Sequence, residues 1–85
     1  MEKGILYFSA PWCGPCKVMS PLIEQMEQQG KIRVKKVNVD YEPTLPQEYN
    51  VKNIPCLILT DLQGNEIKRK IGQMNEQEIL NFYNG

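Results

Sequence analysis

Residues 5–26 read ILYFSAPWCGPCKVMSPLIEQM, and this stretch predicts a buried strand followed by an amphipathic helix. The strand is expected over Ile5–Phe8, where every side chain is apolar or aromatic. The helix is expected to start near Pro15, because proline suits a first helical turn and apolar residues then recur every three or four positions. Pro21 lies inside that pattern and should kink the helix.

The remaining segments predict a second strand and helix, a hairpin and a final helix. We expect strands over 31–40, 56–60 and 66–71, a short helix around 45–49 and a helix that starts near 75. Residues 31–40 carry apolar side chains on both faces, which predicts a central strand covered from both sides. Residues 66–71 are rich in charge and should form an edge strand. Asn75 and Glu78 have the spacing of a capping box. The order β-α-β-α-β-β-α predicts one α/β domain, residues 1–85, with helices on both faces of its sheet.

Charge and hydropathy exclude several partners. Lys and Arg total 10, as do Asp and Glu, so the 85-residue chain lacks the basic excess of a nucleic-acid binder. No apolar run approaches the roughly 18 residues that a membrane span needs. The short apolar run 5–8 is not followed by a small-residue cleavage site. We therefore expect a mature chain that begins at Met1 and stays in the cytoplasm. A monomer is the default expectation for its oligomeric state.

The chain has three cysteines and no histidine. Catalysis by Ser–His–Asp or Cys–His groups is excluded, because both need an imidazole. Three cysteines do not make the disulfide framework of a secreted domain, and one CxxC pair does not close a zinc site. We expect no metal and no cofactor. Pooling of Cys13 and Cys16 from two chains into one metal site is an unfavoured alternative, to be tested by metal analysis.

Cys13 and Cys16 lie where the predicted strand gives way to the predicted helix. The first helical turn has unpaired N–H groups and the positive end of the helix dipole, which stabilise a thiolate. Cys13 is therefore expected to attack a substrate disulfide, and Cys16, one turn further on and less exposed, to resolve the mixed disulfide. A CxxC between a short strand and an amphipathic helix is typical of redox proteins.

The residues around this pair resemble the thioredoxin family. Trp12-Cys13-Gly14-Pro15-Cys16-Lys17 is similar to its active-site motif at every position, and the likeness continues at Pro21, at residues 37–40, at residues 49–55 and at Gly72. The resemblance implies a minimal thioredoxin fold with a four-stranded mixed sheet. The extra N-terminal strand and helix of full-length thioredoxins are not matched, so the size is closer to that of a glutaredoxin.

The resemblance also implies a substrate groove and partners. Ile54–Pro55 would be a cis peptide bond facing the cysteines, and the Ile54 backbone would bind substrate peptide as an added strand. Trp12 and Gly72 would border that groove. The substrates would be protein disulfides, and the electron donor a reductase protein, with glutathione as the alternative donor in a glutaredoxin-like role. A non-catalytic binding module with the same fold is a further alternative.

Two positions depart from the family pattern. Tyr7 stands where thioredoxins usually have a buried Asp, while the matching lysine, Lys36, is kept. We expect Tyr7 and Lys36 to meet behind the cysteines. A neutral tyrosine is a poor base, so resolution by Cys16 should be slow. The alternative is that Tyr7 is a core residue whose hydroxyl is satisfied by Lys36 or water. Cys56 replaces a common threonine and is either a third redox thiol or, as we favour, a small buried apolar residue.

Overall fold

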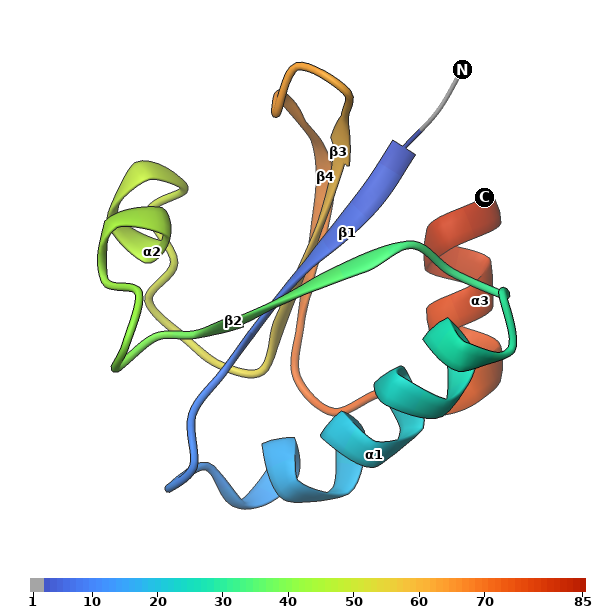
Figure 1. Ribbon diagram of the computed structural model, residues 1–85, viewed down its shortest axis with the longest axis horizontal. Helices are drawn as coiled ribbons and strands as arrows, with labels where there is room; N and C mark the ends of the chain where they lie inside the picture. Colours follow the sequence, from blue (N-terminus) through green and yellow to red (C-terminus); the bar gives the residue numbers. More distant parts are fainter. Residues whose placement is uncertain (1–2) are drawn as a thin grey trace.

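The computed structural model describes residues 3–85 of the chain, so the expected start at Met1 lies outside the described residues. In chain order the elements are β1 (Lys3–Ser9), α1 (Gly14–Gln28), β2 (Val34–Asn38), α2 (Thr44–Glu48), β3 (Cys56–Asp61), β4 (Glu66–Ile71) and α3 (Glu76–Asn84). This is the predicted order. Figure 1 shows α1 and α3 together on one side of the sheet and α2 on the other.

The four strands form one mixed sheet in the order β2-β1-β3-β4. β1 runs parallel to β2 and antiparallel to β3, and β3 runs antiparallel to β4. The α1 crossover explains the parallel pair, because parallel strands need a long connection, whereas a tight turn joins β3 to β4. The edge position predicted for residues 66–71 is confirmed.

The prediction of a central strand over residues 31–40 is wrong in two respects. The strand spans only Val34–Asn38, and it lies at the edge of the sheet, beside β1 alone. Within residues 3–85 no strand pairs with its outer side. Its apolar residues on both faces reflect helices above and below the sheet, which an edge strand next to β1 also meets.

Two apolar layers cover the faces of the sheet. Alternate residues of β1 enter different layers, because successive side chains in a strand point to opposite faces. Tyr7 joins the larger cluster, built with α1 and α3, and Phe8 joins the smaller one, on the side of α2. The loop between β1 and α1 lies at one end of the molecule (Figure 1).

The last helix begins as its sequence predicts. The Asn75 side chain accepts a hydrogen bond from the Glu78 N–H at 2.9 Å, and the Glu78 carboxylate accepts one from the Asn75 N–H at 3.0 Å. This is a complete capping box. No helix within residues 3–85 is long and apolar enough to cross a membrane.

Candidate active site

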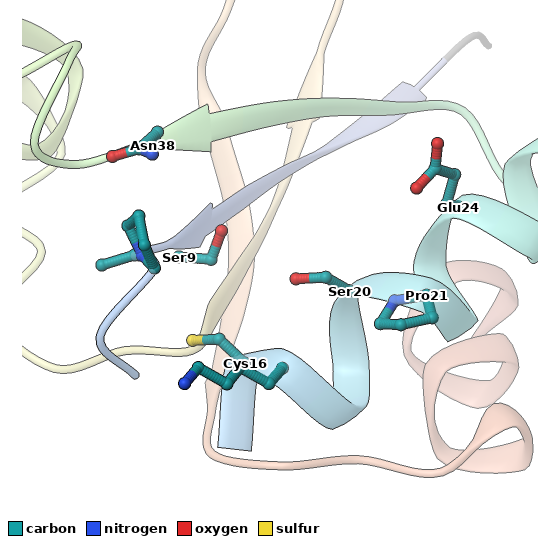
Figure 2. Close-up of a pocket in the computed structure, with 9 residues that line it drawn as sticks. Ser9, Cys16, Ser20, Pro21, Glu24 and Asn38 are labelled. Atoms are coloured by element: carbon teal, nitrogen blue, oxygen red, sulfur yellow. The ribbon is translucent and has the colours of Figure 1, made fainter. Parts of the chain in front are cut away.

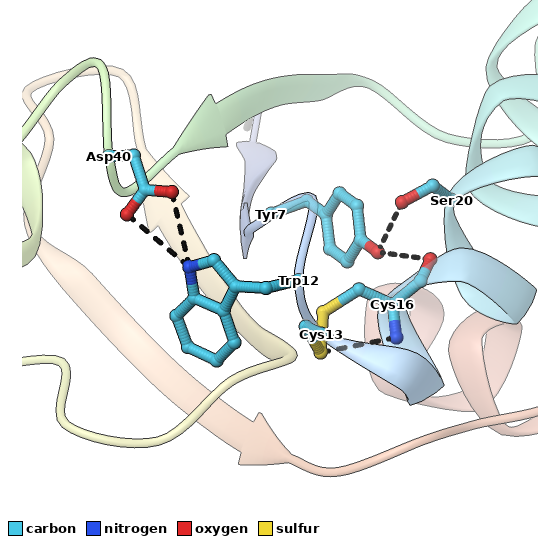
Figure 3. The surroundings of a disulfide bond; sticks show 6 residues. All are labelled: Tyr7, Trp12, Cys13, Cys16, Ser20 and Asp40. Carbon is cyan, nitrogen blue, oxygen red and sulfur yellow. Dashed lines mark hydrogen bonds between the residues drawn. A yellow bond between two sulfur atoms is a disulfide. The ribbon is translucent and has the colours of Figure 1, made fainter.

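The two cysteines of the CxxC motif lie at the start of α1. Cys13 is the residue that caps the helix, with φ −85° and ψ 113°, and Pro15 occupies the first turn. The Cys13 sulfur accepts a hydrogen bond from the Cys16 N–H at 3.3 Å. The two residues form a disulfide, with their Cα atoms 5.2 Å apart (Figure 3). The sulfur of Cys13 therefore sits where the helix N-terminus favours negative charge.

Burial distinguishes the two sulfur-bearing residues only slightly. Cys13 is 5% exposed and Cys16 is 1% exposed. The difference has the predicted direction, with Cys13 on the outer side. Gly14 and Pro15, between them, are exposed, so the connecting backbone is open to a partner.

A second segment approaches the pair from the loop before β3. The Ile54–Pro55 peptide bond is cis, the isomer that the resemblance implies. Ile54 packs against the small cluster formed by Ala10 and the two cysteines. The Pro55 carbonyl accepts a hydrogen bond from the Gly72 N–H at 2.9 Å, and Gly72 has φ +105°, a conformation that favours glycine.

Trp12 lies on the outside of this arrangement. Its side chain is 67% exposed, and its indole N–H donates to the Asp40 carboxylate at 3.1 Å (Figure 3). Asp40 follows β2, so this bond ties the loop before α1 to the end of the neighbouring strand. The sequence does not predict the contact between Trp12 and Asp40, because the two residues are far apart in the chain.

The comparison with protein families decides the identity of this arrangement. The family model described as Thioredoxin matches residues 1–84. The chain belongs to the thioredoxin family. It is 39% identical to a thioredoxin from Rickettsia conorii over 79 residues, which are 91% of this chain and 74% of that protein. It is 35% identical to a thioredoxin from Haemophilus influenzae over 82 residues, 94% of this chain and 76% of that protein.

Solved structures agree with the family assignment. A mutant thioredoxin from Halobacterium salinarum superimposes with a TM-score of 0.84 at 28% identity, over 95% of this chain and 71% of that one. The predicted thioredoxin fold is thus confirmed. Thioredoxins are protein disulfide oxidoreductases, and this member carries their redox-active cysteine pair. Its activity is thiol–disulfide exchange.

Tyr7 lies behind the disulfide of this thioredoxin. Its side chain is buried, and its hydroxyl bonds the Ser20 hydroxyl at 2.8 Å and donates to the Cys16 carbonyl at 3.4 Å (Figure 3). Burial raises the pKa of the Tyr7 phenol, and hydrogen bonds with Ser20 and Ser9 offset this only in part. Tyr7 is therefore a neutral core residue at physiological pH.

The expectation that Tyr7 and Lys36 meet behind the cysteines is wrong. They are partners in the β1–β2 register, so they share a face of the sheet. The Lys36 amine instead forms ion pairs with Glu24 and Glu27 of α1, each at 3.7 Å. It is half-exposed, and a long charged side chain keeps its amine toward water when it can. The hydrogen-bond partners of the Tyr7 hydroxyl are Ser20 and the Cys16 carbonyl, and not Lys36.

Cys56 lies in a different cluster from the active pair. It is a free, fully buried cysteine packed with Phe8, Val37 and Ile58 on the α2 side of the sheet. Burial raises the pKa of its thiol, an effect that the charge of Arg69 opposes. A buried neutral thiol is a poor nucleophile. This agrees with the interpretation of Cys56 as a small buried apolar residue rather than a third redox thiol.

A cavity of 430 Å³ opens beside Cys16, between α1 and the ends of β1 and β2 (Figure 2). Ser20 and Glu24 line it, and sequence reasoning missed both. The signal was present, because they follow Cys16 by four and eight residues and so share its helix face. Among residues 3–85 no group of three or more His, Cys, Asp or Glu side chains is arranged to hold a metal ion.

Proposed function

We propose that this thioredoxin reduces protein disulfides, with Cys13 as the attacking thiolate and Cys16 as the resolving thiol. The observation that carries the proposal is the hydrogen bond from the Cys16 N–H to the Cys13 sulfur at the start of α1. Cys13 attacks one sulfur of the substrate disulfide and releases the other as a thiolate. Cys16 then loses its proton, attacks Cys13 and releases the second substrate sulfur, which leaves the Cys13–Cys16 disulfide and a reduced substrate.

We also propose that substrate peptide lies along the backbone at Ile54. Ile54 packs against the cluster that contains the two cysteines. The carbonyl of Pro55, the residue that follows Ile54, accepts a hydrogen bond from the Gly72 N–H. Apart from Gly72 itself and its two chain neighbours, no heavy atom of residues 3–85 lies within 4 Å of the position that a Cβ would take on Gly72, so that side is open. Exposed Trp12 would form the opposite border, and an extended peptide would pair with the Ile54 backbone as a short added strand.

The electron donor in this proposal is a reductase protein. We further propose that residues 1–85 act as a single domain and a monomer in the cytoplasm, where reducing conditions keep the pair available as thiols. Glutathione, in a glutaredoxin-like role, is the competing donor.

The donor is tested by insulin reduction fed in two ways. One assay supplies NADPH and a thioredoxin reductase, and the other supplies NADPH, glutathione and glutathione reductase. We expect turnover with the first system to exceed that with the second by about tenfold or more, because a docked partner recognises the surface around the pair. Faster turnover with glutathione would establish a glutaredoxin-like role, and no turnover with either donor would favour a non-catalytic binding module.

Tyr7→Asp is expected to speed the resolving step. It places a carboxylate on β1 at the position of Tyr7, behind Cys16, and a positioned base should accelerate deprotonation by about tenfold. The measurement is the rate at which a Cys13 mixed disulfide is resolved, taken on folded protein. Tyr7→Phe, which removes the hydroxyl without adding an acid, is the control. A Tyr7→Asp rate equal to that of the wild type would refute the idea.

A further inference from the structure

A cavity lies beside Cys16, which is itself only 1% exposed, and the lining of this cavity includes none of the groove residues Trp12, Ile54 and Gly72. Cys16 and Ser20 of α1 line it, together with Ser9 at the end of β1 and Asn38 at the end of β2. Figure 2 shows the Cys16 sulfur and the Ser20 hydroxyl pointing into this space. Its 430 Å³ give room for several water molecules, since one needs only about 10–15 Å³ of such volume and a few polar partners.

One carboxylate shares this cavity with the thiol. Cys16, Ser20 and Glu24 recur at four-residue spacing on one face of α1, so they line the same space in series. Among residues 3–85, Glu24 is the only acidic side chain that lines it. Glu24 is about half-exposed, so it can pass a proton on to bulk water.

The Ser20 hydroxyl in the middle of the series is held in place from behind. It bonds the buried Tyr7 hydroxyl at 2.8 Å. A hydroxyl can accept one hydrogen bond while it donates another, so Ser20 can bond Tyr7 and a cavity water at once. Pro21 lies inside α1 and has no N–H, so it does not donate the usual helical hydrogen bond to the Lys17 carbonyl.

We propose that Glu24 is the base for the resolving step, and that it takes the proton of the Cys16 thiol through water held in this cavity, with Ser20 as a positioning residue. The proposal rests on the roles of Cys13 and Cys16 given above. Cys16 gives up its proton to the water chain and forms a bond to the Cys13 sulfur. The bond between Cys13 and the substrate breaks, and the departing substrate thiolate takes up a proton, so that protons and electrons balance.

The charged groups around the cavity are few. Lys17 and Glu24 line it from α1, and Tyr7 stands behind it on β1. Lys36 reaches Glu24 from β2 at 3.7 Å and reaches Glu27 at the same distance. Glu27 does not line the cavity. Glu27 therefore shares the helix, the charge and the lysine partner of Glu24 but lacks access to Cys16, which makes it a matched control.

The test follows the reaction of the reduced protein with limiting Ellman's reagent by stopped flow. The first thionitrobenzoate is released when Cys13 attacks, and the second when Cys16 resolves the mixed disulfide. Wild type, Glu24→Gln, Glu27→Gln and Ser20→Ala are compared across the pH range in which all remain folded. The first phase tests the proposed role of Cys13 as the attacking residue. The rate of the second phase tests the proposed role of Glu24 as the base.

We expect Glu24→Gln to slow the second phase about tenfold near neutral pH. This rate effect is smaller than is usual for a general base, because the proton passes through water. The deficit should shrink as pH rises, because hydroxide then removes the proton. Ser20→Ala should slow the same phase less, with the same pH dependence, and Glu27→Gln should match the wild type in both phases. A normal second phase in Glu24→Gln, or an equal loss in Glu27→Gln, would overturn the role of Glu24. Absence of a first phase in the wild type would overturn the proposed cysteine roles and the base with them.

Discussion

Cys13→Ser is expected to abolish the catalysis of insulin reduction by dithiothreitol, with a loss of at least about a thousandfold in the protein's contribution. A serine hydroxyl at the start of α1 receives the same N–H group and helix dipole, but it is a far weaker nucleophile toward sulfur than a thiolate. The measurement is the onset of insulin precipitation in the presence of wild type or variant.

Cys56→Ala is the control for this substitution. Cys56 is a cysteine too, but it is fully buried in the cluster with Phe8 and Val37 rather than in the cluster of the active pair. We expect Cys56→Ala to retain most of the activity. Residual catalysis in Cys13→Ser, or its loss in Cys56→Ala, would mean that the attacking sulfur has been assigned to the wrong residue.

Phe8→Ala is expected to cause the largest loss of stability, about 3–5 kcal/mol in the free energy of unfolding. Phe8 lies on the central strand β1, is fully buried, and packs against Val37 and Ile58 with its ring centroid 6.3 Å from that of Tyr49. The other fully buried members of this cluster, Val37, Cys56 and Ile58, are all smaller than phenylalanine and would fill the cavity only in part. Stabilities of small domains are about 5–15 kcal/mol, so a loss of this size is a large part of the total.

Urea denaturation followed by circular dichroism measures this loss. Leu62→Ala is the matched control, because Leu62 is also a large apolar residue but is 65% exposed in the turn after β3. It should change stability by less than about 0.5 kcal/mol. A similar small change for Phe8→Ala would show that the α2 side of the sheet is not a packed layer.

Local signals in the sequence predict most of this fold. The strand and helix around the CxxC motif, the charged edge strand and the capping box at Asn75 each follow from neighbouring residues, and the structure contains all of them. The position of residues 34–38 in the sheet could not be predicted in this way. Strand order depends on which distant segments pair, and apolar residues on both faces show only that helices cover both sides.

The active site likewise contains some residues that local sequence signals predict and others that they do not. Cys13 and Cys16 follow from spacing and from the helix N-terminus, whereas Ile54, Pro55 and Gly72 came from the family resemblance. The partner of Lys36 was predicted wrongly because a strand register fixes the backbone but leaves a long side chain free to reach α1. The contact between Trp12 and Asp40, and the cavity shared by Cys16 and Glu24, require the folded chain.

The most direct test of the cysteine roles uses the Cys16→Ser variant, which can attack but cannot resolve. The reduced variant is mixed with a disulfide-bonded protein, and the products are digested and mapped by mass spectrometry without reduction. The account predicts a stable mixed disulfide between the substrate and the peptide that contains Cys13. A substrate linked through Cys56, or no covalent complex in a variant that is folded, would contradict it.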